Sequence, residues 1–151
     1  MPVSENTSGP HELDRFTKAQ ECVYSNVLSE LRNDRKLTHW MWFIFPQLDG
    51  LGNSVTTKLY AIKSLDEAGQ YLNHPVLGPR LVECSEILLG VGDRSITDVL
   101  GFPDDLKLKS SMTLFSCVAG SGFVFDAVLE RCFHSQRDTR TLELLARWDL
   151  S

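Results

Sequence analysis

The sequence has no long apolar run, no dense basic segment and no closely spaced pair of cysteines. Its longest apolar run, residues 40–45, is far shorter than the roughly 20 residues that a membrane-spanning helix needs. Acidic residues outnumber Lys and Arg by 20 to 15, and the formal net charge is −5. Because nucleic acids and anionic lipid surfaces bind dense basic faces, this balance argues against both as partners.

The four cysteines, Cys22, Cys84, Cys117 and Cys132, are widely scattered, which predicts reduced thiols rather than a disulfide framework or a zinc site. The first residues show no basic stretch followed by an apolar one, so we expect no signal peptide and a cytoplasmic protein. The sequence also lacks the Walker loop, Gly-x-Gly-x-x-Gly, His-Glu-x-x-His and Gly-x-Ser-x-Gly motifs. We therefore expect neither a metal nor a cofactor.

A chain of 151 residues, 42% of them hydrophobic, can bury one packed core. Residues 1–10 are expected to form a flexible tail before a single domain over residues 11–151. Apolar residues recur at three- and four-residue steps over 13–31, which predicts one amphipathic helix there. Helix caps are expected at Thr38, Ser54, Ser64, Ser95 and Asp138. Residues 55–62 and 123–129 are rich in β-branched and aromatic residues, but no alternation demands a strand. The pattern predicts a mainly α fold, a compact orthogonal domain of about seven to nine short helices.

The most informative segment is THWMWFIFPQ at residues 38–47. A run so dense in aromatic residues belongs in a core or in the wall of a deep pocket. Trp40 and Trp42 project from different sides of a short helix, so one can anchor the core while the other stacks on a flat ligand. Within the run, His39 is a candidate base or donor, or a packed helix-start residue. Gln47 can point its amide into a cavity or stabilise a turn.

Charged candidates lie further along the chain. Arg80 can clamp a phosphate or tie together buried elements. Asp105 and Lys109 have the i, i+4 spacing of a surface ion pair, or supply charge to a ligand. Lys107, Lys109, Ser110 and Ser111 occupy the first two turns of a helix, although the two serines come late for binding an anion at its free N–H groups.

Several strings together resemble the domain-of-unknown-function family "eighteen-ten". They are RF at 15–16 with AQ at 19–20, HWMWFIFPQ at 39–47, GLG at 50–52, YAI at 60–62, HPVLGPRL at 74–81, GFPDD at 101–105 and KLKSSMTLF at 107–115. The resemblance covers about residues 13–148 and implies a mainly helical fold without an established activity. Members are small bacterial and fungal proteins often labelled calpastatin, a label that does not suit an unrepeated, aromatic-rich chain because true calpastatin is long, disordered and repetitive.

A fainter resemblance links the chain to the NADAR proteins, which act on N-glycosidic bonds of ADP-ribose-type compounds. It rests on Trp42 followed by Gly52-Asn53, and on Asp105 preceding Lys109, in swapped chain order. None of that family's catalytic residues is carried over to this chain.

Two functions remain open on the sequence alone. One is a pocket for a phosphorylated, nucleotide-like or ADP-ribose-like small anion, with or without hydrolysis; its candidate residues are His39, Trp42, Gln47, Arg80, Asp105 and Lys109. The other is a non-catalytic interaction or adaptor module that uses an apolar patch around Phe123 and Phe125. Neither the ligand, the partner nor an enzymatic activity follows from the residues.

Overall fold

The computed structural model describes residues 13–150 apart from 53, 92–93 and 121–122, so the tail predicted for residues 1–10 lies outside it. This part of the chain contains no strand and ten helices, which confirms the mainly α fold: α2 (Asp14–Glu21), α3 (Tyr24–Arg32), α4 (Met41–Ile44), α5 (Val55–Leu59), α6 (Leu65–Asn73), α7 (Leu77–Leu89), α8 (Ile96–Leu100), α9 (Asp104–Ala119), α10 (Val124–Phe133) and α11 (Thr139–Leu150). None of them is long and apolar enough to cross a membrane.

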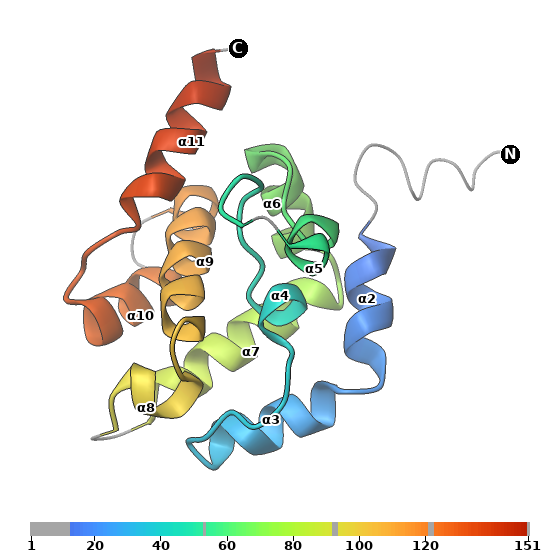
Figure 1. The fold of residues 1–151 in the computed structure, drawn as a ribbon, viewed down its shortest axis with the longest axis vertical. Helices are drawn as coiled ribbons and strands as arrows, with labels where there is room; N and C mark the ends of the chain where they lie inside the picture. The colour runs from blue at the N-terminus through green and yellow to red at the C-terminus, as the bar shows by residue number, and fades with distance from the viewer. Residues whose placement is uncertain (1–12, 53, 92–93, 121–122, 151) are drawn as a thin grey trace, which may run out of the picture.

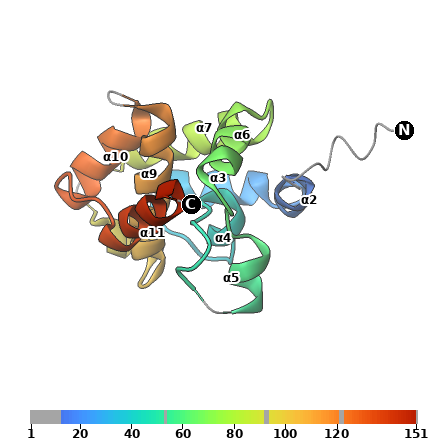
Figure 2. The ribbon, with the colours of Figure 1, turned by 90° about the horizontal axis from the view of Figure 1, so that it is seen from above.

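Two long helices, α7 and α9, organise the packing (Figure 1). Helix α9 contacts α4, α6, α8, α10 and α11, and α7 contacts α3, α6 and α10. Seen from above, α2 and α10 lie at opposite ends of the molecule (Figure 2). Leu108, Met112 and Phe115 of α9 are fully buried and belong to the core.

The prediction of a single helix over residues 13–31 is wrong, because the helix is interrupted at Cys22 and Val23, between α2 and α3. The two helices run at a steep angle to each other (Figure 1). Each has its own packing partner, since α2 contacts α4 whereas α3 contacts α7. Tertiary contacts therefore outweigh the continuous apolar period of the sequence.

Four of the five predicted helix caps are confirmed. Backbone N–H groups donate to Ser54 Oγ, Ser64 Oγ and Ser95 Oγ at 3.0 Å each and to Asp138 Oδ2 at 2.9 Å. The cap predicted at Thr38 is wrong: its hydroxyl donates to Glu30 Oε2 at 2.7 Å, and α4 begins only at Met41. Most of the two segments rich in β-branched and aromatic residues is helical, as residues 55–59 in α5 and 124–129 in α10, whereas Ile62 forms an isolated bridge.

An isolated parallel bridge between Leu48 and Ile62 holds the loop that follows the aromatic run. The Ile62 N–H donates to the Gln47 carbonyl at 2.8 Å, and the Asp49 N–H donates to the Ile62 carbonyl at 2.7 Å. Gly50 then turns the chain with a φ of +104°, and a Cβ built there would lie 3.4 Å from a methyl of Leu144 on α11. A side chain at Gly50 would be strained in this left-handed conformation.

The carboxylate of Glu30, at the end of α3, fixes the segment that leads into α4. It accepts hydrogen bonds from Leu37 N (2.8 Å), Thr38 N (3.1 Å), Thr38 Oγ1 (2.7 Å) and Trp40 Nε1 (2.9 Å). Trp40 is fully buried, and Glu30 is only 8% exposed. No pattern in the sequence predicts this contact, which sets where the aromatic run enters the core.

Two opposed effects act on the pKa of Glu30. Burial raises it, but the hydrogen bonds from Thr38, Leu37 and Trp40 favour the charged form, and the net result is a pKa below the usual value. Because the pKa is lower in the folded state than in the unfolded chain, the resulting stabilisation is complete above the unfolded value. It is lost as the pH falls toward the folded value.

We predict that Glu30→Gln lowers the free energy of unfolding at neutral pH by about 1.5–3 kcal/mol, because the amide cannot replace all the charged hydrogen bonds. It should also flatten the loss of stability below about pH 4.5, where the unfolded carboxyl titrates. Urea unfolding at several pH values measures both effects, with Glu86→Gln on exposed α7 surface as the control. Equal pH profiles for the two variants would contradict the assigned role.

Candidate functional site

Trp42 and Gln47 line one small cavity, together with Leu48, Thr57, Tyr60 and Ala61. The cavity measures about 10 Å³, which is the room needed by one water molecule. His39, Arg80, Asp105 and Lys109 do not line it. Of the six candidate residues, the structure thus brings two together around a space too small for a metabolite.

His39 and Arg80 occupy separate positions. His39 is exposed in the loop before α4. The guanidinium of Arg80 on α7 stacks 4.6 Å from the centre of the Tyr24 ring and donates to Gln20 Oε1 at 3.2 Å. Gln20 in turn donates to the Phe43 carbonyl at 2.6 Å. In this geometry Arg80 joins α7 to α2 and α3, which agrees with the interpretation that it ties buried elements together.

Asp105 is buried at the start of α9 and turned toward α8. Its Oδ2 accepts from Thr97 Oγ1 at 2.6 Å and its Oδ1 from Leu106 N at 2.9 Å. No ion pair joins it to Lys109 among the described side chains. The Asp105 carboxylate links α8 to α9, so its i, i+4 spacing to Lys109 does not decide which residue it contacts.

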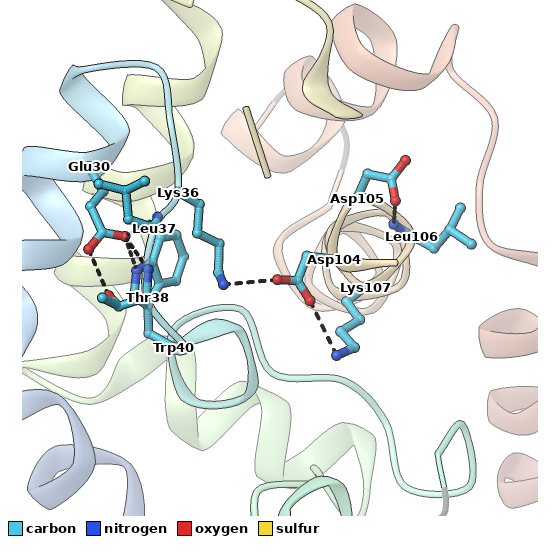
Figure 3. Close-up of polar contacts among 9 residues, drawn as sticks. All are labelled: Glu30, Lys36, Leu37, Thr38, Trp40, Asp104, Asp105, Leu106 and Lys107. Carbon is cyan, nitrogen blue, oxygen red and sulfur yellow. Dashed lines mark hydrogen bonds and ion pairs between the residues drawn. The ribbon is translucent and has the colours of Figure 1, made fainter. Parts of the chain in front are cut away.

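Lys107 is the cation that faces Trp42. Its ammonium lies 4.8 Å from the centre of the Trp42 ring and 3.2 Å from Asp104 Oδ1. The other oxygen of Asp104 lies 2.9 Å from Lys36 Nζ, whose ammonium is also 5.1 Å from the Trp40 ring (Figure 3). Asp104 thereby holds two ammonium groups beside the aromatic run. The sequence placed Lys107 near a possible anion site but gave no way to rank it above Lys109.

Two buried side-chain polar atoms lack a hydrogen-bond partner within the described part of the chain: Trp42 Nε1 and Ser111 Oγ. Ser111 is fully buried and follows Lys107 by four residues, so both lie on the same face of α9. Because α4 packs on α9 and Lys107 overlies Trp42, the indole N–H lies at the α4–α9 contact, and Ser111 lies one turn along α9 from Lys107.

Ser111 differs from the other hydroxyl residues of α9. Ser110, Thr113 and Ser116 each donate to a backbone carbonyl three or four residues earlier, at 3.2, 2.8 and 2.8 Å. The Thr113 oxygen also accepts from Asp138 N at 2.8 Å. Such back-bonding is open to any serine or threonine in a helix, but the Ser111 hydroxyl does not use it.

The α4–α9 contact presents donors and positive charge. A tryptophan N–H and an ammonium can only donate, and a hydroxyl can donate or accept. The Asp104 carboxylate is already engaged by Lys36 and Lys107. This combination suits a ligand that offers oxygen acceptors or negative charge, and the Trp42 ring can contact a flat group.

Thiol and metal chemistry find little support in the described residues. Burial raises the pKa of the Cys84 thiol to about 12, and burial also raises the pKa values of Cys117 and Cys132. These thiols therefore stay protonated at neutral pH and are poor nucleophiles. The same part of the chain shows no group of three or more His, Cys, Asp or Glu side chains placed to hold a metal ion.

We predict that Ser111→Ala leaves the free energy of unfolding unchanged or raises it by up to about 1 kcal/mol, because a buried hydroxyl without a partner costs desolvation energy. Thr113→Val should instead lose about 1–3 kcal/mol, since it removes one hydrogen bond and strands the Asp138 N–H. Chemical denaturation of both variants provides the measurement. A loss above about 1 kcal/mol in Ser111→Ala would show that the hydroxyl has a partner in the folded protein.

Comparison with known proteins agrees with the resemblance read from the sequence. The chain is similar to a solved structure, the crystal structure of the conserved hypothetical protein Rv1873 from Mycobacterium tuberculosis, with 50% sequence identity and a TM-score of 0.89. That alignment covers 91% of this chain and 98% of the other. No curated protein matches the chain. Residues 10–145 match the family described as "Protein of unknown function (DUF1810)", and the chain belongs to that family.

Proposed function

We propose that this chain binds a small anionic ligand with a flat ring, such as a nucleotide or an ADP-ribose-like compound, where α4 meets α9. The observation that carries the proposal is Trp42 Nε1, a buried donor with no partner among the described residues, in a ring whose centre lies 4.8 Å from the Lys107 ammonium. The Ser111 hydroxyl is also buried and without a partner in that part of the chain, one turn further along the same face of α9. A buried donor that lacks a partner in the protein can gain one from a ligand, and that gain favours binding.

Charge supports the same ligand class. Lys36 and Lys107 bring two positive charges to one side of α9, and Asp104 offsets one of them. The remaining positive charge is partly shielded from water, because the Lys36 side chain is only 7% exposed and that of Lys107 23%. A phosphate group would therefore be favoured over a neutral group of the same shape.

The proposal keeps Trp42 and Gln47 from the sequence-based candidates. Gln47 lines the same small cavity as Trp42 and would position the aromatic wall. Lys107 takes the place of Lys109. His39, Arg80 and Asp105 remain candidates only on the sequence pattern. Hydrolysis would need a base other than Asp104, whose carboxylate is engaged by two lysines.

A thermal-shift screen with AMP, ADP, ADP-ribose and ribose 5-phosphate tests the proposal. A ligand at 100 times its dissociation constant adds about 2.7 kcal/mol, which corresponds to a rise in Tm of roughly 5–11 °C for a domain of this size. We expect a shift with at least one ligand, and a change of the Trp42 indole N–H resonance in the same titration. Product analysis of the mixture tests hydrolysis separately. No shift with any of the four would contradict the proposal.

Two lysines of α9 provide a matched comparison. We predict that Lys107→Gln weakens the binding of the responding ligand by about tenfold or more, because it removes a charged contact. Lys109→Gln, with the same change two residues away, should stay within about twofold of the unchanged protein. Trp42→Phe keeps an aromatic ring but loses the N–H, and should weaken binding as well. Equal effects of the two lysine variants would place the ligand elsewhere.

A second candidate function is a protein-interaction module, favoured by an apolar groove of about 520 Å³ that Leu72, Pro79, Val82, Val118 and Phe123 help to line. Phe123 is 42% exposed, whereas Phe125 is fully buried, so the patch expected around both rings involves only the first. The groove would suit the apolar face of a partner helix. If it carries the function, Phe123→Asp abolishes partner retention in a pull-down and Lys107→Gln does not.

A further inference from the structure

A second cavity, of about 570 Å³, lies between the end of α7, the start of α8 and the end of α10. Its lining includes Arg94, Ser95, Thr97, Arg131 and His134. Figures 1 and 2 place α8 and α10 on the side of α9 away from α4, so this space is separate from the α4–α9 contact. Its volume is within the range of small-molecule sites.

The charge of the lining contrasts with that of the whole chain. Two guanidinium groups and an imidazole border the cavity, whereas the formal net charge of the protein is −5. None of the described residues that line it is acidic. Guanidinium groups present paired N–H donors that match the oxygen geometry of a phosphate.

We propose that this cavity binds a small phosphate-type anion, either a phosphate monoester or a pyrophosphate. Arg94 and Arg131 supply the charge, and His134 and Ser95 supply further donors. The Ser95 oxygen accepts from Asp98 N at 3.0 Å, which leaves its own proton for the ligand. The Arg94 guanidinium donates to the Asp98 carbonyl at 3.1 Å, so its position is fixed while its charge is retained.

The C-terminal cap of α10 sets where the rim of the cavity begins. His134 ends the helix with a φ of 55°, in the left-handed conformation common at helix C-termini. Hydrogen bonds from Ser135 N to Leu129 O at 2.9 Å and from Gln136 N to Phe133 O at 3.0 Å hold this turn. The cap thereby fixes the backbone from which the His134 side chain reaches the cavity.

The test is a titration of the full chain with sodium phosphate, glycerol phosphate and sodium pyrophosphate at constant ionic strength, followed by amide resonances. We expect saturating shifts at residues 94–97 and 131–135, with the Trp42 indole resonance unchanged at the concentration that fills this cavity. Arg94→Gln with Arg131→Gln should weaken binding by at least about tenfold. Arg140→Gln with Arg147→Gln removes the same charge from exposed positions on α11 and should change it by less than about twofold.

Two results would overturn the proposal. One is that the resonance shifts do not saturate with any of the anions up to about 10 mM, because such binding is weaker than that of a specific small-molecule site. The other is equal weakening by the cavity pair and the α11 pair, which would show a diffuse charge effect. If the cavity pair does not fold, Arg94→Gln and His134→Asn serve in its place, since asparagine tolerates the left-handed conformation. Shifts at Trp42 alone would support the first site and contradict this one.

Discussion

The path of the chain depends on one carboxylate. Glu30 is buried, and a buried charge is tolerated only when hydrogen bonds replace its water. The bonds from residues 37, 38 and 40 meet that need and fix the turn that leads into α4. The turn also brings Lys36 to α8 and α9, since its N–H donates to the Val99 carbonyl at 2.7 Å and its ammonium reaches Asp104. Trp40 is thereby committed to the core, and Trp42 is left half-buried toward α9.

Helix α9 divides its polar residues between two sides. A residue turns by about 100° relative to its neighbour, so positions two apart point in nearly opposite directions. Asp104 contacts Lys36 and Lys107 beside the aromatic run (Figure 3). Asp105 instead accepts a hydrogen bond from Thr97 on α8. Lys107 and Lys109 are also two positions apart, so their side chains point to nearly opposite sides of α9. One side of the helix gathers donors next to Trp42, and the other side uses its carboxylate to hold α8.

Helix caps could be predicted from the sequence, whereas the contacts between residues far apart in the chain could not. The caps at Ser54, Ser64, Ser95 and Asp138 depend on a few neighbouring residues, and they formed as predicted. The break at Cys22 and the loss of Thr38 as a cap depend on contacts with residues far along the chain, which no local period encodes. Burial of the aromatic run was predictable from its composition, but the half exposure of Trp42 required the fold. The cavity between α7, α8 and α10 had no sequence signal, because its arginines lie 37 positions apart in the chain.

The two proposed sites rest on different physical features: a buried hydroxyl without a partner at one, and concentrated positive charge at the other. At Ser111 a helix that satisfies its other hydroxyls by back-bonding leaves one buried and unpartnered, a local departure of the kind expected at functional positions. A ligand there would relieve the desolvation of that hydroxyl. The cavity beside Trp42 has room for only one water molecule, but a binding space can open when a ligand selects a less populated conformation. At Arg94 and Arg131 the space already exists, and a ligand would be attracted by the electrostatic potential, which ionic strength weakens. The two sites therefore rest on separate physics, and the failure of one would leave the other standing.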